Sequence, residues 1–314
     1  MQRQRSLTFS YMALDQQHEH ERIKQERGEM SFFDHIDELR KHILRSAIAI
    51  AIGGVLCFLN KDFIFDHVIF GPRHPDFPTY RILCNFSHAA GLGESVCFSP
   101  PNFNLITREL GEVIMQVLYV SFWLGIIMAF PYIFWEFWKF ISPGLHEHER
   151  KSARGVVAVC SGLFLLGVLF GYFVIAPFSI SFLAGYTLEG LEVAPTLDSY
   201  VTYISMFTIP TGFIFQMPIA AYFFARIGLV GTALLKSFRR HAIVAILILA
   251  AIITPPDIVS QTLVGIPLYL LYEVSILVVG RVQKRREKQA AEAEKQLIES
   301  EKRIQERNEE EDDD

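Results

Sequence analysis

Two carboxylates carry the clearest chemical signal in this sequence because each lies beside a long apolar segment. Glu38 lies at the edge of the polar face of a predicted amphipathic helix at residues 31–44, and Glu149 lies in the charged segment that follows Phe140. A carboxylate close to a bilayer attracts cations through a low local dielectric, and it can bind a guanidinium through two parallel hydrogen bonds. Glu38, close to the bilayer, therefore predicts a position that attracts cations.

Other polar residues allow more than one interpretation. The run at 146–149, His-Glu-His-Glu, suggests a metal site, but its histidines are two residues apart and no third ligand is evident. Gln216 lies between Pro210 and Pro218, where a buried amide either bonds backbone groups freed by the prolines or has a functional role. Glu273 interrupts an apolar run, so it should face protein or water. Nucleotide-binding and nucleophile motifs are absent, and we expect no cofactor, metal or catalytic residue.

The elements that position these residues follow from composition. Of the 314 residues, 51% are hydrophobic and 20% are charged, and the mean hydropathy is +0.28. Charged residues concentrate in segments 1–45 and 281–314. This pattern excludes a disordered chain, a disulfide-dense mini-protein and a nucleic-acid binder with a basic surface. It is typical of a membrane protein with several spans and charged tails.

Uncharged runs locate the spans because a charge at the bilayer centre costs about 2.5–3.5 kcal/mol. No run alternates with a period of two, so we expect helices and an all-α fold with six spans. The fifth run is short, and we favour a short span over a re-entrant segment there. The six runs cover residues 46–60, 113–135, 155–188, 199–225, 241–256 and 258–280.

Lysine and arginine predict the orientation. Segments 1–45, 132–154, 225–241 and 281–314 hold 25 of the 29 lysines and arginines, so both termini should be cytoplasmic. The outer loops are then 61–108, 177–202 and 254–260. We divide the chain into an extension at 1–30, a membrane domain at 31–280 and a charged, partly helical tail at 281–314.

Cysteine positions agree with this topology. Cys84 and Cys97 both fall in the first outer loop, where disulfides persist. We expect a bond between them that contributes about 3 kcal/mol by the chain-entropy estimate. Two free thiols are the alternative.

Several short motifs, in order along the chain, closely resemble the TatC subunit of the twin-arginine protein translocase. They begin with His-Ile-Asp-Glu-Leu-Arg at 35–40 and Phe-Ile-Ser-Pro-Gly-Leu at 140–145, followed by His-Glu-Arg at 148–150. They continue with Phe-Ile-Phe-Gln-Met-Pro at 213–218, Thr-Pro-Pro-Asp-Ile-Val-Ser-Gln at 254–261 and Ile-Pro-Leu-Tyr at 266–269. The chain departs from the family in its first 30 residues, in a long first outer loop, and in Gln216, where members often have Glu.

The resemblance implies a receptor in the cytoplasmic (inner) membrane that binds the paired arginines of signal peptides on folded cargo. It also implies single-span TatA- and TatB-like partner subunits, a homo-oligomeric receptor complex in membrane lipid, and transport driven by the proton-motive force, without nucleic acid. By the same resemblance, the residues expected to bind the signal peptide are Glu38, Glu149, Leu39, Arg40, Phe140, Pro143 and Arg150. Those expected to act in partner assembly or transport are Pro72, Gln216, Asp257, Gln261 and Glu273. Glu136 and Glu147 should matter much less to peptide binding.

A secondary transporter of small solutes is the main alternative function. It would need internal repeats and charged residues at the bilayer midplane, and only Gln216 and Glu273 approach that requirement. An intramembrane enzyme is a third possibility that lacks any catalytic set.

Overall fold

The computed structural model describes residues 32–89, 103–141, 153–186, 194–254 and 258–312. This part of the chain is built from helices, and its β-bridge pairs Ile106 with Thr196. The elements are α2 (Phe32–Leu59), α3 (Lys61–Phe63), η1 (Ile64–Ile69), η2 (Gly71–Arg73), α4 (Pro78–Ala89), α5 (Glu112–Ile141), α7 (Ala153–Phe170), η4 (Gly171–Ile175), α8 (Ala176–Gly185), α9 (Leu197–Ile214), α10 (Met217–Arg226), α11 (Thr232–Ser237), α12 (Arg239–Ile253) and α13 (Ile258–Asp312). The predicted all-α class is confirmed.

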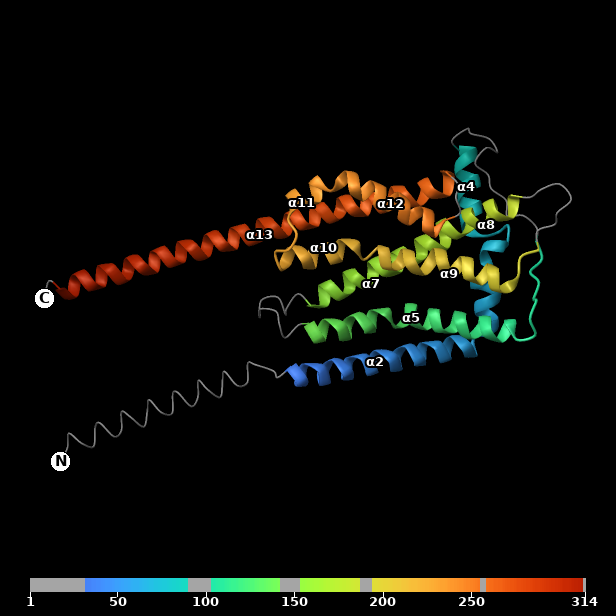
Figure 1. Ribbon diagram of the computed structural model, residues 1–314, viewed down its shortest axis with the longest axis horizontal. Coiled ribbons are helices and arrows are strands. Elements are labelled where there is room, and N and C mark those ends of the chain that lie inside the picture. Colours follow the sequence, from blue (N-terminus) through green and yellow to red (C-terminus); the bar gives the residue numbers. More distant parts are fainter. Residues whose placement is uncertain (1–31, 90–102, 142–152, 187–193, 255–257, 313–314) are drawn as a thin grey trace, which may run out of the picture.

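The long helices run roughly parallel to one another in an elongated bundle (Figure 1). Within the described residues, five helical segments are long and apolar enough to cross a membrane: Ile36–Leu59, Glu112–Ile141, Gly155–Gly185, Leu197–Arg226 and Gln261–Arg303. The remaining predicted span, the short fifth run at 241–256, corresponds to α12, which packs along α13. Its 15 residues extend about 22 Å, less than the roughly 30 Å of a hydrocarbon core.

Helix α2 contains both the predicted amphipathic segment and the first predicted span, in one uninterrupted helix. Its apolar side chains are largely exposed, and only 11% of its most apolar window is buried. Its main neighbour is α5, and the two approach closely because glycines face each other. A Cβ atom on Gly125 would lie 2.6 Å from the backbone nitrogen of Gly54. Small residues permit this kind of contact between membrane helices.

The third and fourth spans contain irregular turns at their prolines. The third span continues as helix past Pro177 to Gly185 through the π-helical η4, so the start of the outer loop expected at 177–202 is wrong. Proline is tolerated there because it follows a widened turn and occupies the first turn of α8. The fourth span breaks between Ile214 and Met217, just before Pro218, since a proline disfavours helical geometry in the preceding residue.

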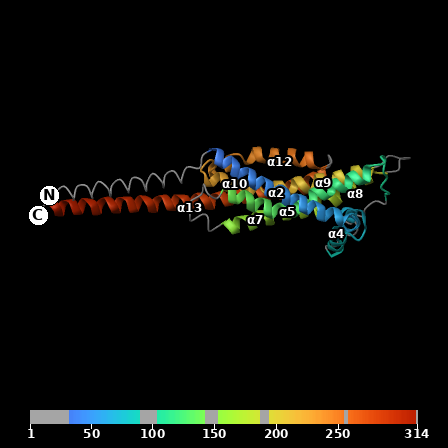
Figure 2. The same ribbon diagram turned by 90° about the horizontal axis from the view of Figure 1, so that it is seen from below.

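The predicted first outer loop contains α3, η1, η2 and α4, which lie at the end of the bundle opposite the start of α2 (Figures 1 and 2). These short elements pack on the third span, where the ring of Phe77 stacks on Phe173 with centroids 5.4 Å apart. The main buried core lies nearby and centres on α9, with Val201 and Phe207 fully buried.

Helix α13 continues from the last span through the charged tail without interruption, over 55 residues. The sequence predicted only a partly helical tail. The start of α2, the α10–α11 connection and the charged part of α13 lie at the same end of the bundle (Figure 1). We call this the tail-bearing end.

Candidate functional site

A buried carboxylate joins α2 to α5 near the tail-bearing end. Glu136 on α5 is only 1% exposed, and its Oε2 lies 2.6 Å from Nδ1 of His42 on α2. Arg45 on α2 lies 3.7 Å from the same oxygen, and Lys139 donates to Oε1 at 3.0 Å. One carboxylate is therefore shared by three basic side chains from two helices, which fixes the start of α2 against the end of α5.

The sequence did not predict this cluster. From the sequence, Glu136 was expected to matter little to peptide binding. The buried and bonded carboxylate of Glu136 was not predicted, and its small effect on peptide binding stays a prediction. The available signal was that Glu136 ends the apolar run at 113–135 and that His42 lies one turn beyond Glu38. Pairing across 94 residues cannot be recognised from one sequence without knowing which helices are neighbours.

Four of the residues expected to bind a signal peptide lie around this cluster. Glu38 on α2 is half-buried, whereas Leu39 and Arg40 are exposed. Phe140 on α5 is half-buried, and its ring contacts the ring of His42 edge-on with centroids 6.2 Å apart. Glu38, Leu39 and Arg40 occupy the turn of α2 that precedes His42, and Phe140 lies at the end of α5 against His42. We call the surface formed by this turn and the end of α5 the α2–α5 face. Pro143, Glu149 and Arg150 lie outside the described residues, as do Glu147 and the predicted histidine pair.

The residues expected to act in assembly or transport are dispersed through the bundle. The Gln216 side chain donates to the carbonyl of Cys160 at 3.1 Å, while its buried Oε1 has no hydrogen-bond partner among the described residues. The Gln261 side chain donates to the carbonyl of Leu247 at 3.2 Å, joining α13 to α12. Asp257 lies outside the described residues.

Glu273 and Pro72 have clear partners. Glu273 accepts hydrogen bonds from Arg239 at 2.7 Å and from the Tyr269 hydroxyl at 3.0 Å, so it faces protein as its position in a span requires. Pro72 is buried at the end of the bundle opposite the tail-bearing end, and its carbonyl accepts from the Tyr80 hydroxyl at 2.9 Å. Burial raises the pKa of Tyr80, which keeps this donor protonated.

A second polar cluster lies at the opposite end of α5 and was not predicted. The carboxylate of Glu112 accepts from the backbone nitrogens of Arg108, at 2.6 Å, and Asp198, at 2.9 Å. Gln116 donates to the Asp198 carboxylate at 2.6 Å. These bonds join the starts of α5 and α9 and satisfy backbone groups that helix ends leave unpaired.

The predicted disulfide lies partly outside the described residues, and the possible metal site at 146–149 lies wholly outside them. Cys84 lies on α4, but Cys97 is not described, so their bond stays a prediction. Among the described residues, no group of three or more His, Cys, Asp or Glu side chains could hold a metal ion.

Taken together, the apolar helices and the polar clusters at both ends of the bundle define a helical membrane protein with several spans. A family model described as "Sec-independent protein translocase protein (TatC)" matches residues 34–267. The chain belongs to the TatC family and is a component of a protein translocase, as the sequence motifs predicted.

Relatives and solved structures agree with this assignment. A TatC protein from Blattabacterium sp. subsp. Periplaneta americana is 40% identical over 271 residues, which cover 84% of this chain and 100% of that protein. One from Helicobacter pylori strain ATCC 700392 / 26695 is 35% identical over 248 residues, covering 79% and 87%. A crystal structure of the twin-arginine translocase receptor TatC in the detergent DDM has a TM-score of 0.61 and 31% identity, covering 78% of this chain and 98% of that one.

Proposed function

We propose that this chain is the receptor and core subunit of a twin-arginine translocase. It binds the Arg-Arg signal peptide of folded proteins and assembles with single-span TatA- and TatB-like subunits for export driven by the proton-motive force. The receptor complex is a homo-oligomer in the cytoplasmic (inner) membrane, with six spans of which α12 is the short fifth, and with both termini in the cytoplasm. Family membership supports the translocation role.

The observation that carries the receptor role is the α2–α5 face. Glu38 presents a half-buried carboxylate there, next to the exposed Leu39 and Arg40, while the buried Glu136 cluster holds the supporting helices together. A carboxylate can bind a guanidinium through two parallel hydrogen bonds, whereas a lysine offers only a point charge. Glu38 therefore contacts one signal-peptide arginine, and Glu149 of the α5–α7 connection contacts the other. Pro143 and Arg150 complete the surface.

The partner contacts belong to other parts of the bundle. Gln216, Gln261 and Glu273 are polar groups among apolar helices, where a partner helix gains from an additional hydrogen bond. In this proposal they contribute to assembly or transport, together with Pro72 and Asp257. A secondary transporter of small solutes is not favoured, because the family match is to a protein translocase.

Peptide binding by the purified full-length chain tests the receptor role. We expect an Arg-Arg peptide to bind more tightly than its Lys-Lys counterpart. Glu38→Gln and Glu149→Gln should each weaken binding of the Arg-Arg peptide by about ten- to a hundredfold, since a charge-assisted contact contributes about 1.5–3 kcal/mol. Glu147→Gln, two residues from Glu149, is the matched control and should bind as the parent does. Equal affinity for both peptides, or parental affinity in both Glu38 and Glu149 variants, would contradict the proposal.

A further inference from the structure

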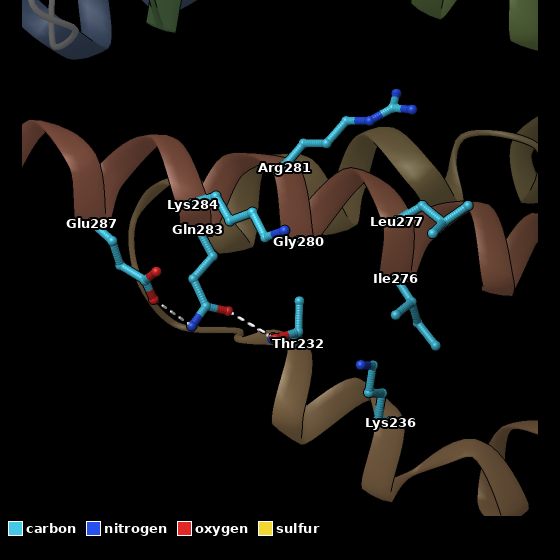
Figure 3. A pocket seen from close by; sticks show the side chains of 9 residues that line it. All are labelled: Thr232, Lys236, Ile276, Leu277, Gly280, Arg281, Gln283, Lys284 and Glu287. Carbon is cyan, nitrogen blue, oxygen red and sulfur yellow. Dashed lines mark hydrogen bonds between the residues drawn. The ribbon is translucent and has the colours of Figure 1, made fainter.

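A pocket of about 440 Å³ lies between α11 and the part of α13 that leaves the last apolar stretch (Figure 3). Helix α11 lines it with Thr232 and Lys236. Helix α13 contributes the rest of the lining: Ile276, Leu277, Gly280, Arg281, Gln283, Lys284 and Glu287. None of these residues belongs to the α2–α5 face, so the pocket is a separate site at the tail-bearing end.

Hydrogen bonds inside the pocket occupy its single carboxylate. Gln283 accepts from the backbone nitrogen of Thr232 at 3.2 Å and from its hydroxyl at 2.9 Å. The amide nitrogen of Gln283 then donates to the carboxylate of Glu287 at 3.0 Å (Figure 3). Gln283 thus holds Glu287 at one edge of the pocket, and among the described residues Glu287 forms no ion pair with Lys236 or Lys284.

Two lysines remain available to an anion. Figure 3 shows Lys236 rising from α11 toward α13, and Lys284 reaching back along α13 toward Gly280. Arg281 points away from α11. Both lysines are exposed, and neither takes part in an ion pair of the described residues. Two ammonium groups lining one pocket repel each other, and a bound anion would remove that repulsion.

The apolar surroundings favour an anion that belongs to a lipid. Ile276 and Leu277 line the pocket on the side of the last span, and Leu277 is 63% exposed. Leu234 and Phe238, in and next to α11, are also exposed. A surface with exposed apolar side chains beside cations is typical of the boundary between acyl chains and headgroups, and basic pockets at this depth bind anionic headgroups.

We propose that this pocket binds the phosphate group of an anionic phospholipid, with Lys236 and Lys284 as its cationic ligands and the acyl chains beside Leu277. The bound lipid would join α11 to α13, adding to the hydrogen bonds of Thr232. This lipid site goes beyond the proposed receptor function and does not depend on it.

Native mass spectrometry of the full chain in detergent can measure the bound lipid directly. We expect the parent to retain phosphatidylglycerol at least tenfold more tightly than phosphatidylcholine. Lys236→Gln combined with Lys284→Gln should abolish this preference, whereas replacing both lysines by arginine should preserve it. Lys295→Gln with Lys302→Gln removes the same charge from exposed tail positions and should behave as the parent. The thermal unfolding midpoint of each variant shows whether the fold is intact.

Two outcomes would overturn the assignment. The first is unchanged phosphatidylglycerol affinity in a folded Lys236/Lys284 double variant, or equal affinity of the parent for the two lipids. The second is displacement of phosphatidylglycerol by an equimolar amount of inorganic phosphate. In that case the site would recognise a free phosphate ion, and the apolar lining of Ile276 and Leu277 would contribute nothing to binding.

Discussion

At the residue scale, Glu136 matters because of what surrounds its carboxylate. It is buried, yet His42, Arg45 and Lys139 all lie within 4.0 Å of its oxygens. Replacing it with an apolar residue would leave the buried His42 ring without its partner, and an unsatisfied buried polar group costs about 1–3 kcal/mol. The cluster thus holds together the two helices that form the α2–α5 face.

We therefore expect Glu136→Leu to lower the free energy of unfolding by about 1–3 kcal/mol, measured in detergent from the thermal unfolding midpoint. Glu299→Leu is the control, because Glu299 is exposed and pairs only with Arg303 on the same helix. It should change stability by no more than about 0.5 kcal/mol. An equal effect of the two substitutions would show that the Glu136 cluster does not hold α2 to α5.

At the element scale, the contact of α2 with α5 depends on a glycine that has no room for a side chain. A methyl group on Gly125 would meet backbone atoms of Gly54 and of Ile50, at 2.6 and 2.9 Å. Backbone atoms cannot rotate away as a flexible side chain can, so the helices would have to separate. Overpacking of this kind typically costs about 1–3 kcal/mol.

Gly125→Ala should accordingly lower the free energy of unfolding by about 1–3 kcal/mol, measured from the thermal unfolding midpoint. Gly162→Ala in α7 is a matched control within another span, because nothing lies within 4 Å of its added methyl group. There alanine should be neutral or stabilising by up to about 1 kcal/mol through helix propensity. If both substitutions were neutral, the close approach of α2 and α5 would not be a source of stability.

We expect the short length of helix α12 to affect transport. A span of about 22 Å requires the bilayer to thin or the protein to adapt, and a thinner bilayer presents a lower barrier to moving a folded protein across. Inserting four leucines after Ile248 would lengthen α12 by about 6 Å.

We expect this insertion to reduce transport of a twin-arginine substrate while the protein still inserts into the membrane. Four alanines inserted after Ala293, in the exposed part of α13, should leave transport unchanged. Normal transport by a correctly inserted Ile248 variant would show that the shortness of α12 is incidental.

At the scale of the whole molecule, the proposed topology places the two ends of the helix bundle on opposite sides of the membrane, and thiol labelling at each end tests it. Tyr186 follows α8 at one end of the bundle, and Ser237 lies in α11 at the tail-bearing end; both are exposed. In a background without native cysteines, Tyr186→Cys should react with a membrane-impermeant thiol reagent from outside intact cells. Ser237→Cys should react only after the membrane is opened. Labelling of both from the same side would refute the six-span orientation.

The sequence predicted much of this architecture because hydropathy and charge act along the chain. Apolar runs located the five long helical segments and α12, and the motifs included Glu38 in α2 and Phe140 in α5, the two helices that Glu136 joins. The break at Gln216 and the helix that continues past Pro177 were harder to predict, since local backbone adjustment decides whether a proline ends a helix. Contacts such as His42 with Glu136, or Thr232 with Gln283, depend on which helices are neighbours.

The continuity of α13 has a mechanical consequence. Because the helix does not break at Gly280, its charged part extends about 48 Å beyond the last span and is rigidly coupled to it. A tilt of about 10° in the membrane-embedded half would displace the far end by about 8 Å. The last span and the tail thus form a lever that converts a small rearrangement among apolar helices into a large displacement at the tip of the tail.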